Sequence, residues 1–183
     1  NNPENRNLSI TSPSNIISVD FLIDDVGSPN YVVMFKGKTI IDTSSLGFDL
    51  KDQVSIHDGL EIVGKETSSI VGSWEMPWGE QRIVHNDYNE LIVKLREREA
   101  PNRVLNIHFK VYDDGVGFRY EFPVQDGVNS VIILDENTEF NLTEDHTCWW
   151  IPGDWDIYEH LYNTSKFSEI DTHALPEQQW LAQ

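Results

Sequence analysis

LIVKLREREAPNRVLNIHFKVYDDGVGFRYEF, residues 91–122, is the stretch that decides the fold class of this chain. Apolar side chains occupy every second position in three runs, which is the period of a half-buried β-strand. The runs begin at Leu91, Leu105 and Phe118, and the connections at 97–102 and 113–115 have the charged and glycine-containing composition of turns. The stretch therefore predicts three consecutive strands in a meander.

The same two-residue period recurs on both sides of this meander. It predicts strands at 17–23, 46–50, 131–134 and 138–142, and a hairpin at 31–41. No window keeps apolar residues at helical spacing over three turns. Because one open sheet of so many strands would twist and leave long edges, we expect an all-β chain that forms a large antiparallel β-sandwich.

Length, charge and cysteine content limit the classes of function. The 183 residues fit a single domain. The net charge is −18, from 13 Lys and Arg against 31 Asp and Glu, and this field repels a phosphate backbone, so no nucleic acid is expected as a partner. No stretch approaches the roughly 20 apolar residues of a membrane span. Cys148 is the only cysteine, and we expect a small buried apolar residue rather than a nucleophile.

Two segments, residues 73–80 and 147–160, hold five of the six tryptophans. Aromatic rings stack on the apolar faces of sugars while carboxylates and amides bind sugar hydroxyls, so a saccharide is the first ligand class to consider. The alternative is that these tryptophans pack in the core or at a domain interface.

Residues 154–183 lack the alternation of apolar and polar residues that is typical of strands. They are expected to be a partly irregular tail or linker.

Carboxylates in the same two segments are hard oxygen ligands of the kind that calcium prefers. They are Glu75, Glu80, Asp154, Asp156 and Glu159. The spacing lacks the glycine and the final glutamate of an EF-hand loop, so ligands from elsewhere would have to complete a site. For all but Glu159 the alternative is a solvated surface charge.

His85 lies in the polar run before Leu91. It is either a catalytic acid or base or a residue that stabilises a turn.

Four separate motifs resemble, in their order and spacing, the N-terminal domain of glycoside hydrolase family 97. They are PWGE at 77–80, HNDYNEL at 85–91, YDDGVGFRYEFP at 112–123, and WWIPGD at 149–154 followed by Glu159 and SEI at 168–170. The likeness extends from about Ile10 to about Ile170. It implies an N-terminal β-super-sandwich domain over residues 1–170, with residues 171–183 as a tail or the start of a linker to a missing catalytic barrel.

The resemblance also implies a function. Enzymes of the family act on α-glucosides or α-galactosides, and the acid and the base or nucleophile belong to the barrel, so no catalytic residue is expected here and the chain alone should be inactive. One glutamate of the N-terminal domain helps to hold a calcium ion in the active site. Aligned on Gly153-Asp154, that glutamate is Glu159. Calcium is thus a cofactor of the full-length enzyme, and the chain alone should bind it weakly or not at all.

The implied partners are the catalytic barrel domain of the same polypeptide and the oligosaccharide substrate of the full-length enzyme, in the periplasm or outside a bacterial cell. Trp149, Trp150 and Trp155 are then expected to be core and interface groups that pack against the barrel. The alternative from another class is a free-standing calcium-dependent carbohydrate-binding module, for which the tryptophans and carboxylates would suffice.

Overall fold

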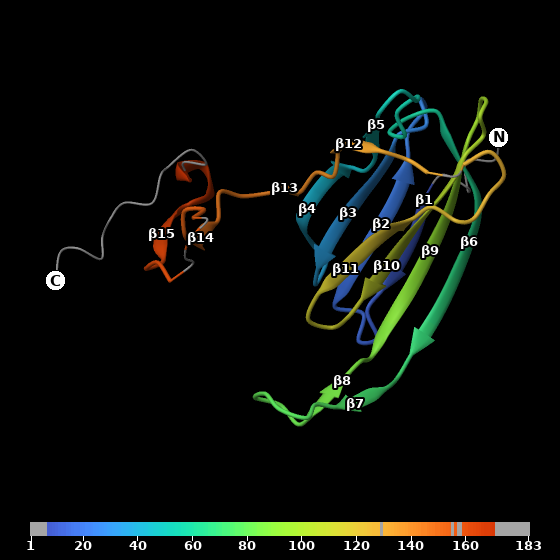
Figure 1. Ribbon diagram of the computed structural model, residues 1–183. Coiled ribbons are helices and arrows are strands. Elements are labelled where there is room, and N and C mark those ends of the chain that lie inside the picture. The colour runs from blue at the N-terminus through green and yellow to red at the C-terminus, as the bar shows by residue number, and fades with distance from the viewer. Residues whose placement is uncertain (1–6, 129, 155, 157–158, 171–183) are drawn as a thin grey trace. The chain divides into compact units, whose positions relative to one another are not determined.

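The computed structural model describes residues 7–128, 130–154, 156 and 159–170. The chain divides into two compact units, one that ends at Asn141 and one that begins at Leu142 (Figure 1). The first unit holds two large β-sheets, and the second holds a short two-stranded sheet. The predicted tail, residues 171–183, lies outside the described residues.

Two large sheets make up the first unit. One has the strand order β1-β2-β3-β4-β13, and the other has the order β11-β10-β9-β6. The bounds in the first sheet are β1 (Asn7–Thr11), β2 (Ile17–Ile23), β3 (Pro29–Phe35), β4 (Lys38–Ser45) and β13 (Asn141–Leu142). Those in the second are β6 (Leu60–Ile70), β9 (Tyr88–Glu97), β10 (Val104–Val111) and β11 (Val116–Glu121). A smaller pair joins β5 (Phe48–Leu50) to β12 (Ile133–Glu136).

The predicted meander is present as β9, β10 and β11, which pair antiparallel. Phe109 lies opposite Leu91 on one side and opposite Phe118 on the other, so the apolar positions of three strands share one face. That face packs against β2, where the rings of Phe21 and Phe109 lie 6.2 Å apart. Both phenylalanines are fully buried, and burial of each contributes about 1.5–3 kcal/mol. The expected antiparallel β-sandwich is confirmed.

The longest strand, β6, was not predicted because its sequence does not alternate. It has 11 residues, yet after Leu60 its side chains are mostly polar and exposed on both faces. It is an edge strand with β9 as its neighbour, so its backbone pairing rather than side-chain burial holds it in the sheet. The sequence pattern also missed β1 and two short strands, β7 (Ser73–Glu75) and β8 (Ile83–His85), which pair in a hairpin between β6 and β9.

The second unit is built on β14 (Thr147–Trp150) and β15 (Asn163–Lys166), which pair antiparallel, followed by a 3₁₀ turn at Phe167–Glu169. Asp145 holds this turn by accepting hydrogen bonds from the Ser168 amide and hydroxyl, each at 2.9 Å. The strand β15 lies within residues 154–183, which were expected to be a partly irregular tail or linker, and its polar sequence has no alternation that would predict a strand. No helix in the described part of the chain is long and apolar enough to cross a membrane.

Candidate functional site

Glu159 lies in the connection between β14 and β15 of the second unit. This connection begins with a local turn, in which the Asp156 amide donates to Asp154 Oδ1 at 2.9 Å. The other oxygen of Asp154 lies 3.0 Å from Nε2 of His160, whose side chain is 9% exposed. Asp154 therefore ties down the residue next to Glu159. The sequence analysis did not single out His160, because only the folded loop brings it to Asp154.

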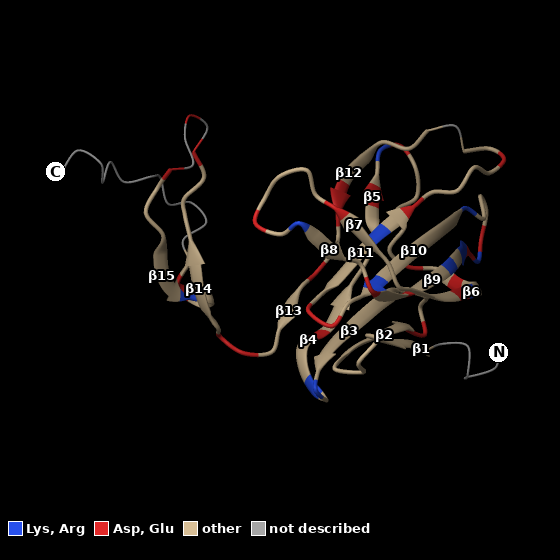
Figure 2. Ribbon diagram, turned by 90° about the horizontal axis from the view of Figure 1, so that it is seen from below, with Lys and Arg blue, Asp and Glu red and all other residues tan. Residues whose placement is uncertain are grey.

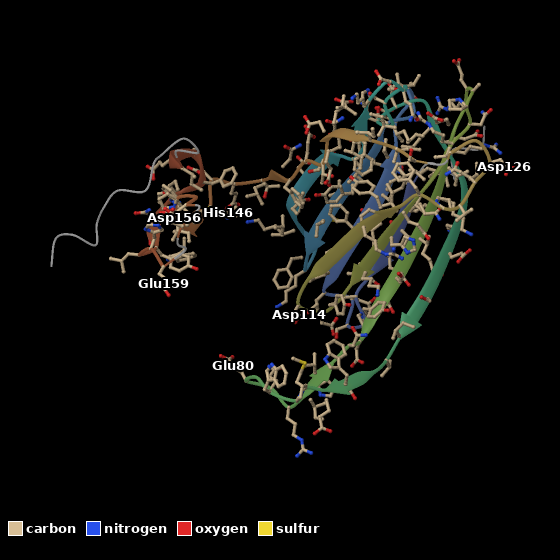
Figure 3. The ribbon with its side chains drawn as sticks, viewed as in Figure 1. Glu80, Asp114, Asp126, His146, Asp156 and Glu159 are labelled. Carbon is tan, nitrogen blue, oxygen red and sulfur yellow. The ribbon has the colours of Figure 1, made fainter. Side chains whose placement is uncertain are left out.

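The carboxylate of Glu159 is exposed, and no hydrogen bond or ion pair engages it among the described residues. Figure 3 places it on the second unit together with Asp156. The described residues contain no group of three or more His, Cys, Asp or Glu side chains arranged to hold a metal ion. Calcium takes six to eight oxygen ligands, so Glu159 fits the role of one contributed ligand and not of a complete site.

The tryptophans of the second unit differ in environment. Trp150 is partly buried, and its Nε1 donates to the Ser165 hydroxyl across the β14–β15 pair at 3.0 Å. Trp149 points to the other face of β14 and is 67% exposed. Trp155 lies outside the described residues. Trp150 thus holds the hairpin together, whereas Trp149 is available to a partner. Cys148, which precedes Trp149 in β14, is a free, partly buried thiol.

The other tryptophan-rich segment forms a projecting hairpin, here called the arm (residues 71–87), which continues from the ends of β6 and β9 beyond the two sheets (Figure 1). Trp74 is 48% and Trp78 is 81% exposed. Glu75 pairs with Arg82 at 2.8 Å, and Glu80 lies near the tip of the arm (Figure 3). Large exposed aromatic groups that gather on one element are typical of an interaction surface.

The polar run at residues 85–90 forms turn contacts at the base of the arm. Asp87 accepts a hydrogen bond from the Gly72 amide at 3.0 Å, and Asn86 accepts one from the Tyr112 hydroxyl at 3.2 Å. His85 is exposed at the end of β8, opposite Ser73. These contacts favour the interpretation of this run as turn stabilisation.

A polar cluster on the outer face of the four-stranded sheet was missed by sequence reasoning. His108 Nε2 lies 2.7 Å from Glu121 Oε2, and its Nδ1 lies 3.5 Å from Glu90 Oε1. Asn106 Nδ2 donates to the same Glu121 oxygen at 3.1 Å. The hydrogen bonds from Asn106 and His108 lower the pKa of Glu121, which keeps this carboxylate charged. Glu90 and Glu121 lie in two of the family motifs, but the sequence does not show that they meet at His108, because cross-strand register assembles the cluster from three strands.

The fold and these surfaces define a class of protein. It is a β-sandwich domain that exposes aromatic and carboxylate side chains on its arm and in its second unit. The sequence matches the profile of the glycosyl-hydrolase 97 N-terminal family over residues 10–179, and the chain belongs to this family. The family resemblance in the four sequence motifs is thereby confirmed.

Solved structures show the same relationship. The chain is 36% identical to a glycoside hydrolase family 97 enzyme from a Pseudoalteromonas species, solved in complex with panose, and it superposes on 86% of its own length with a TM-score of 0.79. It is 25% identical to a β-arabinopyranosidase, with a TM-score of 0.75 over 85% of this chain. A probable retaining α-galactosidase of Streptomyces bingchenggensis is 27% identical over 113 residues, 62% of this chain.

All three relatives are much longer than this chain. It covers 24% of the Pseudoalteromonas enzyme, 26% of the β-arabinopyranosidase and 17% of the Streptomyces protein. In family 97 enzymes the catalytic domain is a part separate from this N-terminal domain.

Proposed function

We propose that this chain is the non-catalytic N-terminal domain of a calcium-dependent α-glycoside hydrolase, packs against its catalytic barrel, and contributes Glu159 to the active-site calcium. The observation that supports this most directly is the exposed Glu159 carboxylate, which has no partner among the described residues although the loop beside it is tied down by Asp154 and His160. A carboxylate held on an anchored loop is ready to complete a site whose other ligands come from the barrel.

When bound, calcium would neutralise clustered carboxylates and polarise a water molecule or the substrate at the sugar carbon. The role of this chain would be to orient one oxygen ligand, the carboxylate of Glu159. The proposal includes an α-glucoside or α-galactoside substrate and a periplasmic or secreted location, both of which follow from the family resemblance.

The test is Glu159→Gln in the full-length enzyme. Removing the charge while keeping the shape should raise the calcium concentration needed for half-maximal activity by at least about tenfold, since a neutral amide is a weaker ligand for calcium than a carboxylate. The calcium-dependent rise in melting temperature should shrink in parallel, because a ligand that binds only the folded state stabilises it. The matched control is Asp156→Asn, which removes another exposed carboxylate from the same loop and should leave both responses unchanged.

Calorimetry on the 183-residue chain completes the test. One carboxylate supplies at most two oxygens, so the chain alone should bind calcium weakly or not at all. Tight binding by the chain alone, or full calcium response in the Glu159→Gln enzyme, would contradict the proposal.

The exposed Trp74 and Trp78 on the arm favour one alternative, a free-standing calcium-dependent carbohydrate-binding module. Titration with panose separates the two. A binding module should show tryptophan fluorescence changes that saturate and depend on calcium, whereas a domain whose arm covers a barrel should show none when the barrel is absent.

A further inference from the structure

The outer face of the four-stranded sheet carries a small notch lined by both polar and apolar side chains. Its volume is about 260 Å³. It is lined by His108, Lys110, Tyr112, Gly117, Phe118 and Arg119. Gly117 lies directly opposite Lys110 across the β10–β11 pair, and Arg119 lies opposite His108. The notch exists because position 117 has no side chain where its neighbours on the same face have long ones.

Arg119 distinguishes this notch from the rest of the surface. Among the arginines that the structure describes, Arg82, Arg96 and Arg103 pair with carboxylates, and Arg98 donates to the Asp25 carbonyl. The exposed Arg119 guanidinium makes no hydrogen bond or ion pair with any described residue. The hydrogen bonds from Asn106 and His108, and then the charges of His108 and Arg119, lower the pKa of Glu121, so Arg119 acts on one nearby carboxylate without being bonded to it.

The second cation at the notch is held in place by an aromatic ring. Lys110 Nζ lies 4.3 Å from the centroid of the Tyr88 ring. The side-chain hydrogen bond with Tyr88, together with the nearby charge of Glu90, raises the pKa of Lys110. Lys110 therefore stays positively charged at neutral pH.

The carboxylates near the notch are already engaged. Both ring nitrogens of His108 face Glu90 and Glu121, and Glu121 also accepts from Asn106. Neither glutamate lines the notch, although acidic and basic positions are close together on this sheet (Figure 2). The lining thus offers the positively charged donors of Lys110 and Arg119 and no acidic group.

We propose that this notch binds an oxyanion group, a carboxylate or a phosphate, of a small ligand through Arg119 and Lys110. The planar guanidinium presents two parallel N–H donors that match two oxygens of a carboxylate or phosphate, and the lysine adds a point charge. The absence of a side chain at Gly117 lets the group approach the strand, while the rings of Tyr112 and His108 border the space beside it.

The test follows the amide signal of Gly117 and the Nε–H signal of Arg119 by NMR during titrations of the chain at constant ionic strength. The probes are glucuronate, inorganic phosphate and glucose. At least one of the two anions should shift both signals in a saturable way, and glucose should not. Tighter binding of glucuronate identifies an acidic sugar as the source of the group, and tighter binding of phosphate identifies a phosphorylated ligand.

Two variants address the two halves of the argument. Arg119→Gln removes the free donor and should weaken anion binding by at least about tenfold. Gly117→Leu should have a comparable effect by filling the notch; a Cβ at this position meets no heavy atom within 4 Å, so the strand can accept it. The controls are Lys51→Gln, which removes an exposed cation elsewhere, and Gly72→Leu, which adds an exposed side chain at a second open glycine.

The proposal fails if neither anion gives saturable shifts, if glucose gives the same shifts, or if Arg119→Gln binds as tightly as the unaltered chain. Loss of binding in the Lys51→Gln control would show that net charge and not the notch attracts the anion, and would also overturn it.

Discussion

At the scale of single residues, one buried ion pair closes the connection between β9 and β10. Glu97 accepts hydrogen bonds from the backbone amide and Nε of Arg103, both at 2.8 Å. The side chains are 2% exposed for Arg103 and 10% for Glu97. Arg103 also donates to Gln53 Oε1 at 3.1 Å and to the Val54 carbonyl at 2.6 Å, so it joins a second loop to this one. Such a pair depends on both partners, because a single buried charge is costly.

Replacing Glu97 by Gln should therefore lower the free energy of unfolding by about 3–5 kcal/mol, measured by urea denaturation, since it leaves the Arg103 charge buried and unpaired. The matched control is Glu61→Gln, which removes the partner of Arg96 from an exposed pair whose side chains are 49% and 43% exposed. That change should cost about 1 kcal/mol or less. Equal costs for the two variants would show that burial does not govern the Glu97–Arg103 pair.

At the scale of elements, the arm has little that holds it to the core. Its two strands pair over three residue positions, and the side chains of β7 are all exposed. Trp74 Nε1 contacts Met76 Sδ at 3.3 Å within the arm, and the ring of Trp78 is largely exposed. The arm therefore contributes surface rather than stability, and an apolar surface on a weakly held element favours association with a partner.

The double substitution Trp74→Ser and Trp78→Ser should reduce self-association of the chain, measured by light scattering across a concentration series. The urea midpoint should change by no more than the equivalent of about 0.5 kcal/mol, because neither ring is part of the core. Val124→Ser is the control, since Val124 is fully exposed but lies outside the arm. A monomer at all concentrations before any substitution would count against the arm as an association surface.

At the scale of the whole molecule, two tyrosines link stability to alkaline pH. Burial raises the pKa of Tyr31 and of Tyr120 to about 12 each. The Tyr31 hydroxyl donates to the Glu139 carbonyl at 2.7 Å, and the Tyr120 hydroxyl lies 2.7 Å from the Thr138 hydroxyl. The folded state therefore keeps these protons at a pH at which an unfolded tyrosine, with a pKa near 10, releases its own.

The sign of the pH dependence follows from proton linkage. Between about pH 10 and pH 12 the folded state binds more protons than the unfolded state, so stability should be fully present below pH 10 and fall as the pH rises toward 12. Urea midpoints measured from about pH 8 to about pH 12 test this, and Tyr31→Phe should reduce the slope. A single absorbance transition near pH 10 for all six tyrosines would contradict the buried state of this pair.

The alternating stretches of the sequence determined the strands of the core and the class of the fold. The period of two is a local property, because successive side chains of a strand point to opposite faces, so Leu91, Val93 and Leu95 of β9 share one face whatever the neighbouring strand is. The four family motifs are likewise local strings. They indicated the family and pointed to Glu159, whose role as a calcium ligand stays a prediction.

Only the tertiary structure decided the strands and contacts that lack a local pattern. β6 is held by backbone pairing to β9 while most of its side chains after Leu60 are exposed, so its composition carries no alternation. The His108 cluster and the notch at Gly117 depend on which residue of β11 lies opposite which residue of β10, and a one-residue shift would turn these side chains to the other face. Register is set by long-range pairing of whole strands, which no short segment of sequence contains.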